Sequence, residues 1–359
     1  MGDDPVALDL RRQADACRSL ASPLTGALLD GAAADYVAQG VVHRLLRDFP
    51  DDPLASALSL RLAGALHHLV LTGRAPALAA HYPSAGGSWN VQATAELWHA
   101  AAATLAQHER EVRTFLTLPP QTNEVGRSGV LLGGFLEVAR RTGLPLALRE
   151  IGASAGLNLF WDQYRYDLGE AQWGDPASPV RIACQWRGSC PDLTTPVEVA
   201  SRRGCDPNPL PIATDSDRLR VAAYVWADQT ERLARQRAAM AIAAARPSPI
   251  QVAGAAAWIE AELFRRQRGE TLVVYHSIVM QYIPKAERSR FRALLANVGE
   301  TATDRTPLAW LAMEPFRVGK RFEYELTLTL WPGGREERLA TRVHPHGHKA
   351  NWTLGTVRE

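Results

Sequence analysis

The segment Gly152–Gly156, with the sequence Gly-Ala-Ser-Ala-Gly, is where residue types and spacing first point to chemistry. It follows an apolar run and fits two incompatible patterns. As Gly-x-Ser-x-Gly it matches the sharp turn that presents a serine nucleophile, here Ser154, above the sheet of a hydrolase. As an acid, Glu150, followed by small residues at alternate positions, it matches a loop over which a nucleotide-like cofactor lies.

The order of residues along the chain supports the hydrolase interpretation. Ser154 precedes Glu314, which precedes His344 and His346. This is the order of the nucleophile, acid and histidine in α/β-hydrolases. Such a turn normally follows several strands, whereas the segments before residue 146 have helical periodicity. A serine hydrolase that uses Ser154 is therefore kept as an alternative.

The cofactor interpretation explains more of the chain. Glu150 ends one predicted strand, and Asp206 ends the next, where a carboxylate can accept both ribose hydroxyls of an adenosine group. The interval between them exceeds the usual spacing of roughly 20 residues, which we attribute to an inserted hairpin at about 162–198. The predicted cofactor-binding residues are Glu150, Gly152, Ala153, Ser154, Gly156, Asn158, Asp206, Asn208, Gly254 and Ala255.

A parallel sheet is needed to bring these side chains together. Short apolar segments alternate with helical patterns, which predicts a mostly parallel sheet with helices on both faces. Ligands of such sheets lie outside the carboxyl ends of the strands. The predicted strands are 144–151, 197–206, 249–254, 271–279 and 307–315, and the predicted helices are 130–143, 156–166, 215–245, 255–269 and 284–299. Asn208 is a plausible helix N-cap before Pro209, and residues 322–347 predict a closing antiparallel hairpin around Trp-Pro-Gly-Gly.

The first third of the chain has a different pattern. From residue 9 to about 118, apolar residues recur at three- and four-residue spacing, which predicts five or six helices. We therefore expect a helical substrate or cap domain at 1–120 and a Rossmann-like domain at 121–359.

Several segments carry a family resemblance. The chain resembles DUF2332, a bacterial family of unknown function, through NEVGRS, EIGASAGLN, RRGCDPNPL, YHSIVMQYIP, AWLAMEP, LTLWPGG and HPHG. From about Asn123 onward it also resembles class I S-adenosylmethionine-dependent methyltransferases. That resemblance implies a seven-stranded α/β sheet whose last strand inserts antiparallel near one edge, with S-adenosylmethionine as cofactor.

The chain departs from the methyltransferase pattern at three places. Ser154 replaces the middle glycine of the usual E-x-G-x-G-x-G. Gly254 and Ala255 stand where an acid often contacts the adenine amino group. The helix expected between Glu314 and the hairpin is nearly absent. A nucleoside-binding sensor without catalytic activity is therefore a further alternative.

Methyl transfer from a sulfonium requires an aligned acceptor, exclusion of water and sometimes a base. The candidates for acid–base catalysis are His276, Glu314 and His346. Substrate- or cofactor-orienting roles are expected for Asn123, Glu124, Arg127, Tyr282 and His344. The HPHGH segment invites a metal interpretation, but Pro345 and Gly347 make it a turn, and we expect no metal.

Composition limits the partners. The 359-residue chain has a formal charge of +2 and dispersed arginine pairs, so we expect no nucleic-acid partner. It has neither a signal-peptide pattern nor an apolar run of roughly 20 residues, which predicts a cytoplasmic protein without membrane contact. The four cysteines form no C-x-x-C pair. A small-molecule substrate and a monomer or homodimer are the expectation.

Overall fold

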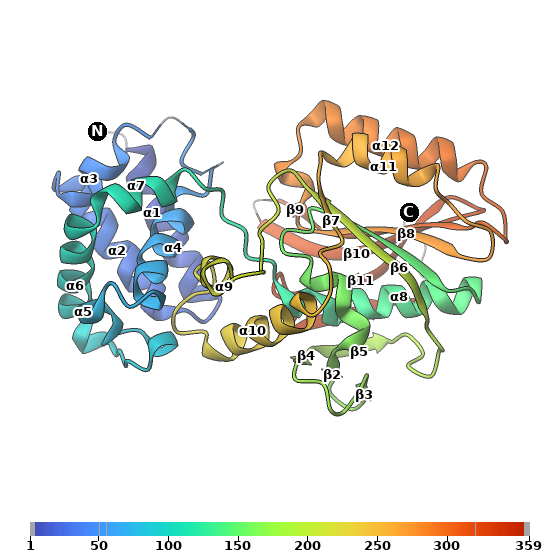
Figure 1. Ribbon diagram of the computed structural model, residues 1–359, viewed down its shortest axis with the longest axis horizontal. Coiled ribbons are helices and arrows are strands. Elements are labelled where there is room, and N and C mark those ends of the chain that lie inside the picture. Colours follow the sequence, from blue (N-terminus) through green and yellow to red (C-terminus); the bar gives the residue numbers. More distant parts are fainter. Residues whose placement is uncertain (1–3, 50, 55, 320, 355–359) are drawn as a thin grey trace. The chain divides into compact units, whose positions relative to one another are not determined.

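The computed structural model describes residues 4–49, 51–54, 56–319 and 321–354 (Figure 1). The chain forms two compact units, each built from two stretches of sequence. One unit contains Met1–Thr122 and Pro211–Arg237, and the other contains Asn123–Leu210 and Ala238–Glu359.

Helices make up the first unit, and their apolar faces enclose one core. Residues 211–237 belong to it because Ala223, Tyr224 and Ala227 are buried in this core. The local sequence pattern predicts this segment within the domain at 121–359, because the residues that it packs against lie far away along the chain. The elements are α1 (Pro5–Ser19), α2 (Pro23–Val37), α3 (Val41–Leu46), α4 (Leu58–Leu71), α5 (Pro76–Ala79), η1 (Pro83–Ala85), η2 (Val91–Ala93), α6 (Thr94–Gln107), α7 (Glu109–Leu116) and α9 (Asp215–Ala222).

The single helix predicted at 215–245 is wrong, because the chain breaks between α9 and α10 (Thr230–Ala244). In the break, the Asp228 carboxylate accepts hydrogen bonds from the Ser22 hydroxyl and from the Leu24 amide, the latter at 3.0 Å. Asn208 is not a helix N-cap either. Helix α9 begins seven residues later, where Thr214 and Asp217 form a capping box.

The second unit is built on a mixed, mostly parallel sheet of nine strands. Their order is β5-β12-β11-β10-β9-β8-β1-β6-β7. The five strands from β9 to β7 run parallel, whereas β10 is antiparallel to both β9 and β11. The strands are β1 (Leu146–Ile151), β5 (Gln185–Ser189), β6 (Val199–Asp206), β7 (Ile250–Val252), β8 (Thr271–Ser277), β9 (Leu308–Val318), β10 (Arg321–Trp331), β11 (Arg335–Thr341) and β12 (Lys349–Thr353).

Helices cover both faces of this sheet. Figure 1 shows α11 (Ala255–Leu263) and α12 (Lys285–Gly299) on one face and α8 (Ser128–Thr142) on the other. On the α8 face, Phe135 stacks on Trp161 with ring centroids 4.5 Å apart and meets the Tyr275 ring edge-on at 5.0 Å. On the opposite face, strand residues such as Val274 pack with Phe291 and Trp258 of the two helices.

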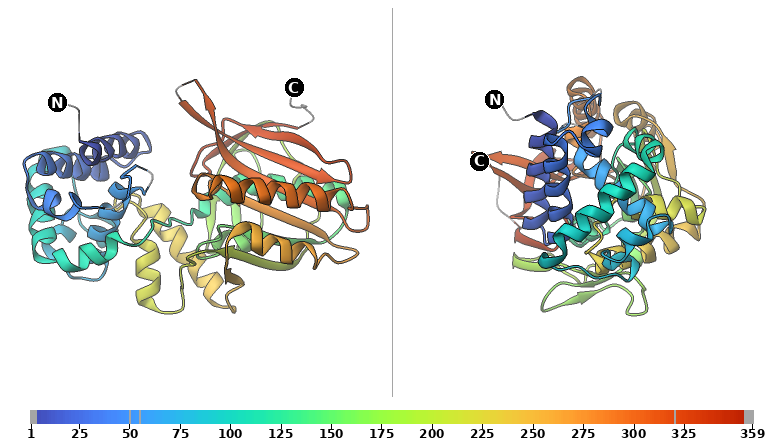
Figure 2. Two further views of the ribbon diagram at one scale, coloured as in Figure 1. Left: turned by 90° about the horizontal axis from the view of Figure 1, so that it is seen from above. Right: turned by 90° about the vertical axis from the view of Figure 1, so that its left-hand side faces the viewer.

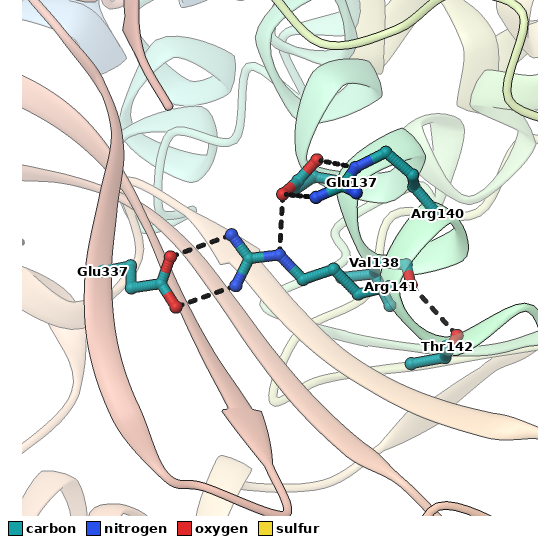
Figure 3. Close-up of polar contacts among 6 residues, drawn as sticks. All are labelled: Glu137, Val138, Arg140, Arg141, Thr142 and Glu337. Atoms are coloured by element: carbon teal, nitrogen blue, oxygen red, sulfur yellow. Dashed lines mark hydrogen bonds and ion pairs between the residues drawn. The ribbon is translucent and has the colours of Figure 1, made fainter. Parts of the chain in front are cut away.

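Helix α8 is also held to the antiparallel part of the sheet by ion pairs (Figure 3). The guanidinium of Arg141 binds both oxygens of Glu337 on β11, each at 2.8 Å, and its Nε donates to the buried Glu137 at 2.6 Å. Arg140 also binds Glu137, at 2.8 and 2.9 Å. Hydrogen bonding to Arg141 lowers the pKa of Glu337.

Two segments differ from simple α/β alternation. The helix predicted at 156–166 is instead the 3₁₀ segment η4 (Leu157–Gln163). The region predicted as an inserted hairpin contains β2 (Arg165–Asp167), β3 (Gln172–Trp173) and β4 (Arg181–Ala183), which form a separate small sheet. Strands β9 and β10 continue as a hairpin past β8, because β9 pairs with β8 only as far as Met313 (Figure 2).

Candidate functional site

The carboxyl edge of the parallel strands gathers most of the predicted site residues. The strand order reverses between β1 and β8, so the connections leaving these two strands go to opposite sides. Crevices at such points hold the ligands of open α/β sheets. Glu150 and Asp206 lie at the ends of β1 and β6, and His276 lies at the end of β8.

The loop after β1 is tightly packed. Gly152, Ser154 and Gly156 have φ angles of +67°, +53° and +74°, a region that favours glycine. A Cβ atom at Gly152 would overlap Cγ2 of Val279, and one at Gly156 would lie 2.6 Å from Cδ1 of Ile250. Neighbouring side chains therefore require glycine at these two positions, whether or not a ligand also approaches the loop.

Asp206 holds the same loop. Its Oδ2 accepts a hydrogen bond from the amide of Ser154 at 3.0 Å, and its Oδ1 accepts one from the amide of Asn208 at 2.8 Å. The Ser154 carbonyl in turn accepts a bond from the amide of Leu210 at 3.2 Å.

Glu150 is a buried acid with an unusual pKa. Its side chain is only 3% exposed, and its Oε2 accepts a hydrogen bond from the hydroxyl of Tyr275 at 3.2 Å. Burial, together with the smaller effect of the negative charge of Asp206, raises the pKa of Glu150 to about 8 despite the opposing effects of Tyr275 and Arg127. A neutral carboxylic acid at this position can donate a hydrogen bond as well as accept one.

A third acid reaches this edge from α12. Gly254 and Ala255 lie at the start of α11, where Glu287 accepts a hydrogen bond from the Ala256 amide at 3.2 Å. Oε1 of Glu287 would lie 2.8 Å from a Cβ atom at Gly254. The sequence therefore has no acid directly after β7, but the fold brings one to that place.

The segment before α8 is tied to two other motifs. The Asn123 Oδ1 accepts a bond from the Leu157 amide at 3.0 Å, and Asn158 donates to the carbonyl of Glu124 at 3.3 Å. The Glu124 side chain accepts the amide of Gly126 at 2.9 Å. Arg127 donates to the carbonyls of Ser277 at 2.9 Å and Pro345 at 3.0 Å, so this segment joins the loops after β1, β8 and β11.

His276 and Glu314 form a direct pair. Nδ1 of His276 lies 2.7 Å from Oε1 of Glu314, which also accepts the amides of Val279 and Met280 at 3.0 and 3.3 Å. The indole of Trp310 donates to Nε2 of His276 at 3.0 Å. The Glu314 side chain is 18% exposed, and among the described residues no donor reaches its Oε2.

The histidines of the HPHGH segment form a cluster of their own. The rings of His344 and His348 stack in parallel with centroids 4.6 Å apart, and the His346 ring lies edge-on to both. The His346 amide donates to Nδ1 of His344 at 3.1 Å. Within the described ranges, no group of three or more histidine, cysteine or acidic residues is arranged to hold a metal ion.

Sequence reasoning missed five residues that shape this edge: Tyr275, Val279, Glu287, Trp310 and Tyr324. Tyr324 on β10 lies near three predicted residues. The pKa of Tyr324 is raised, mainly by burial. Arg127 lowers this pKa, whereas Tyr282 and Glu314 raise it. Tyr282 itself is 66% exposed. Tyr275 lies on the most apolar strand, next to His276. Its hydroxyl is a polar group within an apolar segment, and this was the one sequence signal that could have identified a missed site residue.

The fold and this edge define a class, an α/β protein with a mostly parallel sheet and acidic groups at the strand ends. Residues 7–352 match the family described as "Uncharacterized protein conserved in bacteria (DUF2332)", and the chain belongs to this family. No curated protein and no solved structure gives a match. None of the described helices has the length and apolar character needed to cross a membrane.

Proposed function

We propose that the second unit binds S-adenosylmethionine at the carboxyl edge of β1, β6 and β8 and transfers its methyl group to a small-molecule acceptor. One observation carries this proposal. Five parallel strands in the order β7-β6-β1-β8-β9 stand beside the antiparallel β10, and acids end both β1 and β6. The order of these five strands supports the proposal, because it agrees with the parallel part of the sheet that the methyltransferase resemblance implies. The rest of the sheet differs from that expectation: it has nine strands rather than seven, and the antiparallel strand beside β9 is β10, which follows β9 directly in a hairpin, rather than the last strand of the chain.

The residues at this edge fit the cofactor in distinct ways. In this proposal, Asp206 at the end of β6 accepts hydrogen bonds from the ribose hydroxyls, and Glu287, whose carboxylate lies at the start of α11, accepts one from the adenine amino group. The loop 152–156 leaves only small side chains between β1 and the bound group. When bound, S-adenosylmethionine supplies an electrophilic methyl group, and the chain's own task is to orient the acceptor and exclude water.

The contacts of Glu314 favour this function over the serine hydrolase. A hydrolase with the chain order Ser154, Glu314, His344 or His346 needs Glu314 to orient one of the last two histidines. Glu314 instead binds His276 and two backbone amides. A nucleoside-binding sensor would use the same edge, and it differs from the enzyme in binding the cofactor without turnover.

Hydrogen–deuterium exchange with and without S-adenosylhomocysteine tests where the cofactor binds. We expect slower exchange in peptides that cover 150–158, 204–210 and 252–257. The peptide of α8, which lies away from these loops in sequence, serves as the internal control. Protection confined to other segments, or none at saturating ligand, would contradict the proposed site.

A further inference from the structure

The hydrogen bonds around His276 fix which ring nitrogen carries its proton. An indole N–H is a donor only, so the Trp310 bond requires a lone pair on Nε2 of His276. The proton of the neutral ring then lies on Nδ1, from which it is donated to Glu314 over 2.7 Å. Both ring nitrogens therefore have partners within the protein, and His276 is only 1% exposed.

Glu314 connects His276 to the loop after β8. Its Oε1 accepts the amides of Val279 and Met280 in addition to the proton of His276. The Val279 side chain lies where a Cβ atom of Gly152 would be. A chain of direct contacts therefore runs from Trp310 through His276 and Glu314 to the loop after β1.

The geometry points to a positioning role for His276: Trp310 locks its Nδ1–H tautomer, and His276 locks Glu314, which holds the loop 277–282 against Gly152. His276 is thus not the base that its place at the strand end suggested. Its relevance to methyl transfer rests on the proposed function, whereas the tautomer and the loop contact are measurable without it.

Two spectroscopic measurements test the tautomer. In protein labelled with ¹⁵N-histidine at about pH 7.5, we expect the Nε2 of His276 to resonate as an unprotonated nitrogen and Nδ1 as a protonated one. The His276→Asn variant assigns these signals by their disappearance. In Trp310→Phe, the Nε2 signal should move while Nδ1 stays protonated. A protonated Nε2 in the wild-type protein would overturn the assignment.

Hydrogen exchange tests the positioning role. Asparagine can place an N–H group near the position of Nδ1, whereas alanine cannot. We expect exchange in the 277–282 peptide to rise at least tenfold in His276→Ala and to remain within about threefold of wild type in His276→Asn. Equal exchange in the wild type and His276→Ala would refute the positioning role, provided that the α8 peptide shows both proteins to be folded.

Calorimetry with S-adenosylhomocysteine connects this role to the site. Affinity should fall at least fivefold in His276→Ala and stay within twofold in His276→Asn. If the wild type does not bind, the proposed function fails, and the nitrogen shifts and exchange rates still decide the role of His276. If the wild type binds and the two variants bind equally well, the loop is held without any effect on the site, which would overturn the link to the cofactor.

Discussion

The hydroxyl of Tyr275 on β8 donates a hydrogen bond of 3.2 Å to Oε2 of Glu150 at the end of β1. Both side chains are buried, and the pair joins the two strands between which the sheet order reverses. Because burial raises the pKa of Glu150 to about 8, the candidate site contains an acid that is largely protonated near neutral pH. Because of this acid, we expect the free energy of unfolding to fall as the pH rises from about 4.5 to about 8.

Glu150→Gln should remove a pH dependence of stability. The pKa of Glu150 is about 8 in the folded protein, against an ordinary value of 4.5. Its stabilising contribution is thus complete below about pH 4.5 and is lost as the pH rises to 8. Each pH unit in this window costs the wild type up to about 1.4 kcal/mol relative to the variant. Urea denaturation at several pH values measures the difference, and parallel profiles would contradict it.

Tyr275→Phe is the matched control for this titration. The hydroxyl of Tyr275 lowers the pKa of Glu150, so its removal should raise that pKa further. The loss of stability should then extend to higher pH than in the wild type. Carboxyl ¹³C chemical shifts report the midpoint directly.

Gly152→Ala should destabilise the loop after β1 through two separable effects. A residue with a Cβ atom at a φ of +67° costs about 1–2 kcal/mol, and the new methyl group would displace Val279. In a double-mutant cycle, Val279→Ala should be less destabilising in the Gly152→Ala background by about 1 kcal/mol. Additive effects in chemical denaturation would show that the two side chains do not compete for this space.

Arg141→Met should lower the free energy of unfolding by about 3 kcal/mol, because it leaves the buried Glu137 with Arg140 alone and removes both bonds to Glu337. The bond from Arg141 lowers the pKa of Glu337, so its contribution is present above the ordinary value and is lost as the pH falls through the folded pKa. The difference between wild type and Glu337→Gln should therefore shrink as the pH falls below about 4.5. A constant difference would be inconsistent with the ion pair.

Ser154→Gly separates the cofactor loop from the hydrolase. Ser154 has a φ of +53°, so glycine relieves strain there and should keep the stability within about 1 kcal/mol of wild type. We expect S-adenosylhomocysteine affinity to be retained and the wild type to resist an active-serine fluorophosphonate. Labelling of the wild type that is lost in Ser154→Gly would favour the hydrolase.

The sequence predicted the strands of the parallel sheet because each combines a buried apolar run with a short polar or glycine-containing boundary. The segment 271–277 is one example. The antiparallel hairpin around Trp331 was predicted from its turn residues and its alternating pattern instead. Local pattern did not predict the break at Asp228, because its cause is a bond to residues about 200 positions away. Glu287 was not predictable for the same reason. Its carboxylate reaches the start of α11 only because α12 packs beside α11, and the local sequence does not show this packing.

Some of the candidate site residues could likewise be predicted from local sequence, and others could not. Glu150 and Asp206 were predicted from their places at strand ends, and both lie at the carboxyl edge. The partners of His276 were not predictable, because Trp310 and Glu314 approach it from a strand more than 30 residues later. A histidine at a strand end has the same local sequence whether its nitrogens face a ligand or a tryptophan.

Isothermal titration of the purified protein with S-adenosylmethionine, repeated on Asp206→Ala, tests the central claim most directly. Arg141→Met serves as a destabilised control whose substitution lies outside the carboxyl edge. The proposed function predicts micromolar binding by the wild type and the control, and a loss of about 1.5–3 kcal/mol or more in Asp206→Ala. Absence of binding in the wild type, or equal affinity in Asp206→Ala, would contradict the cofactor site.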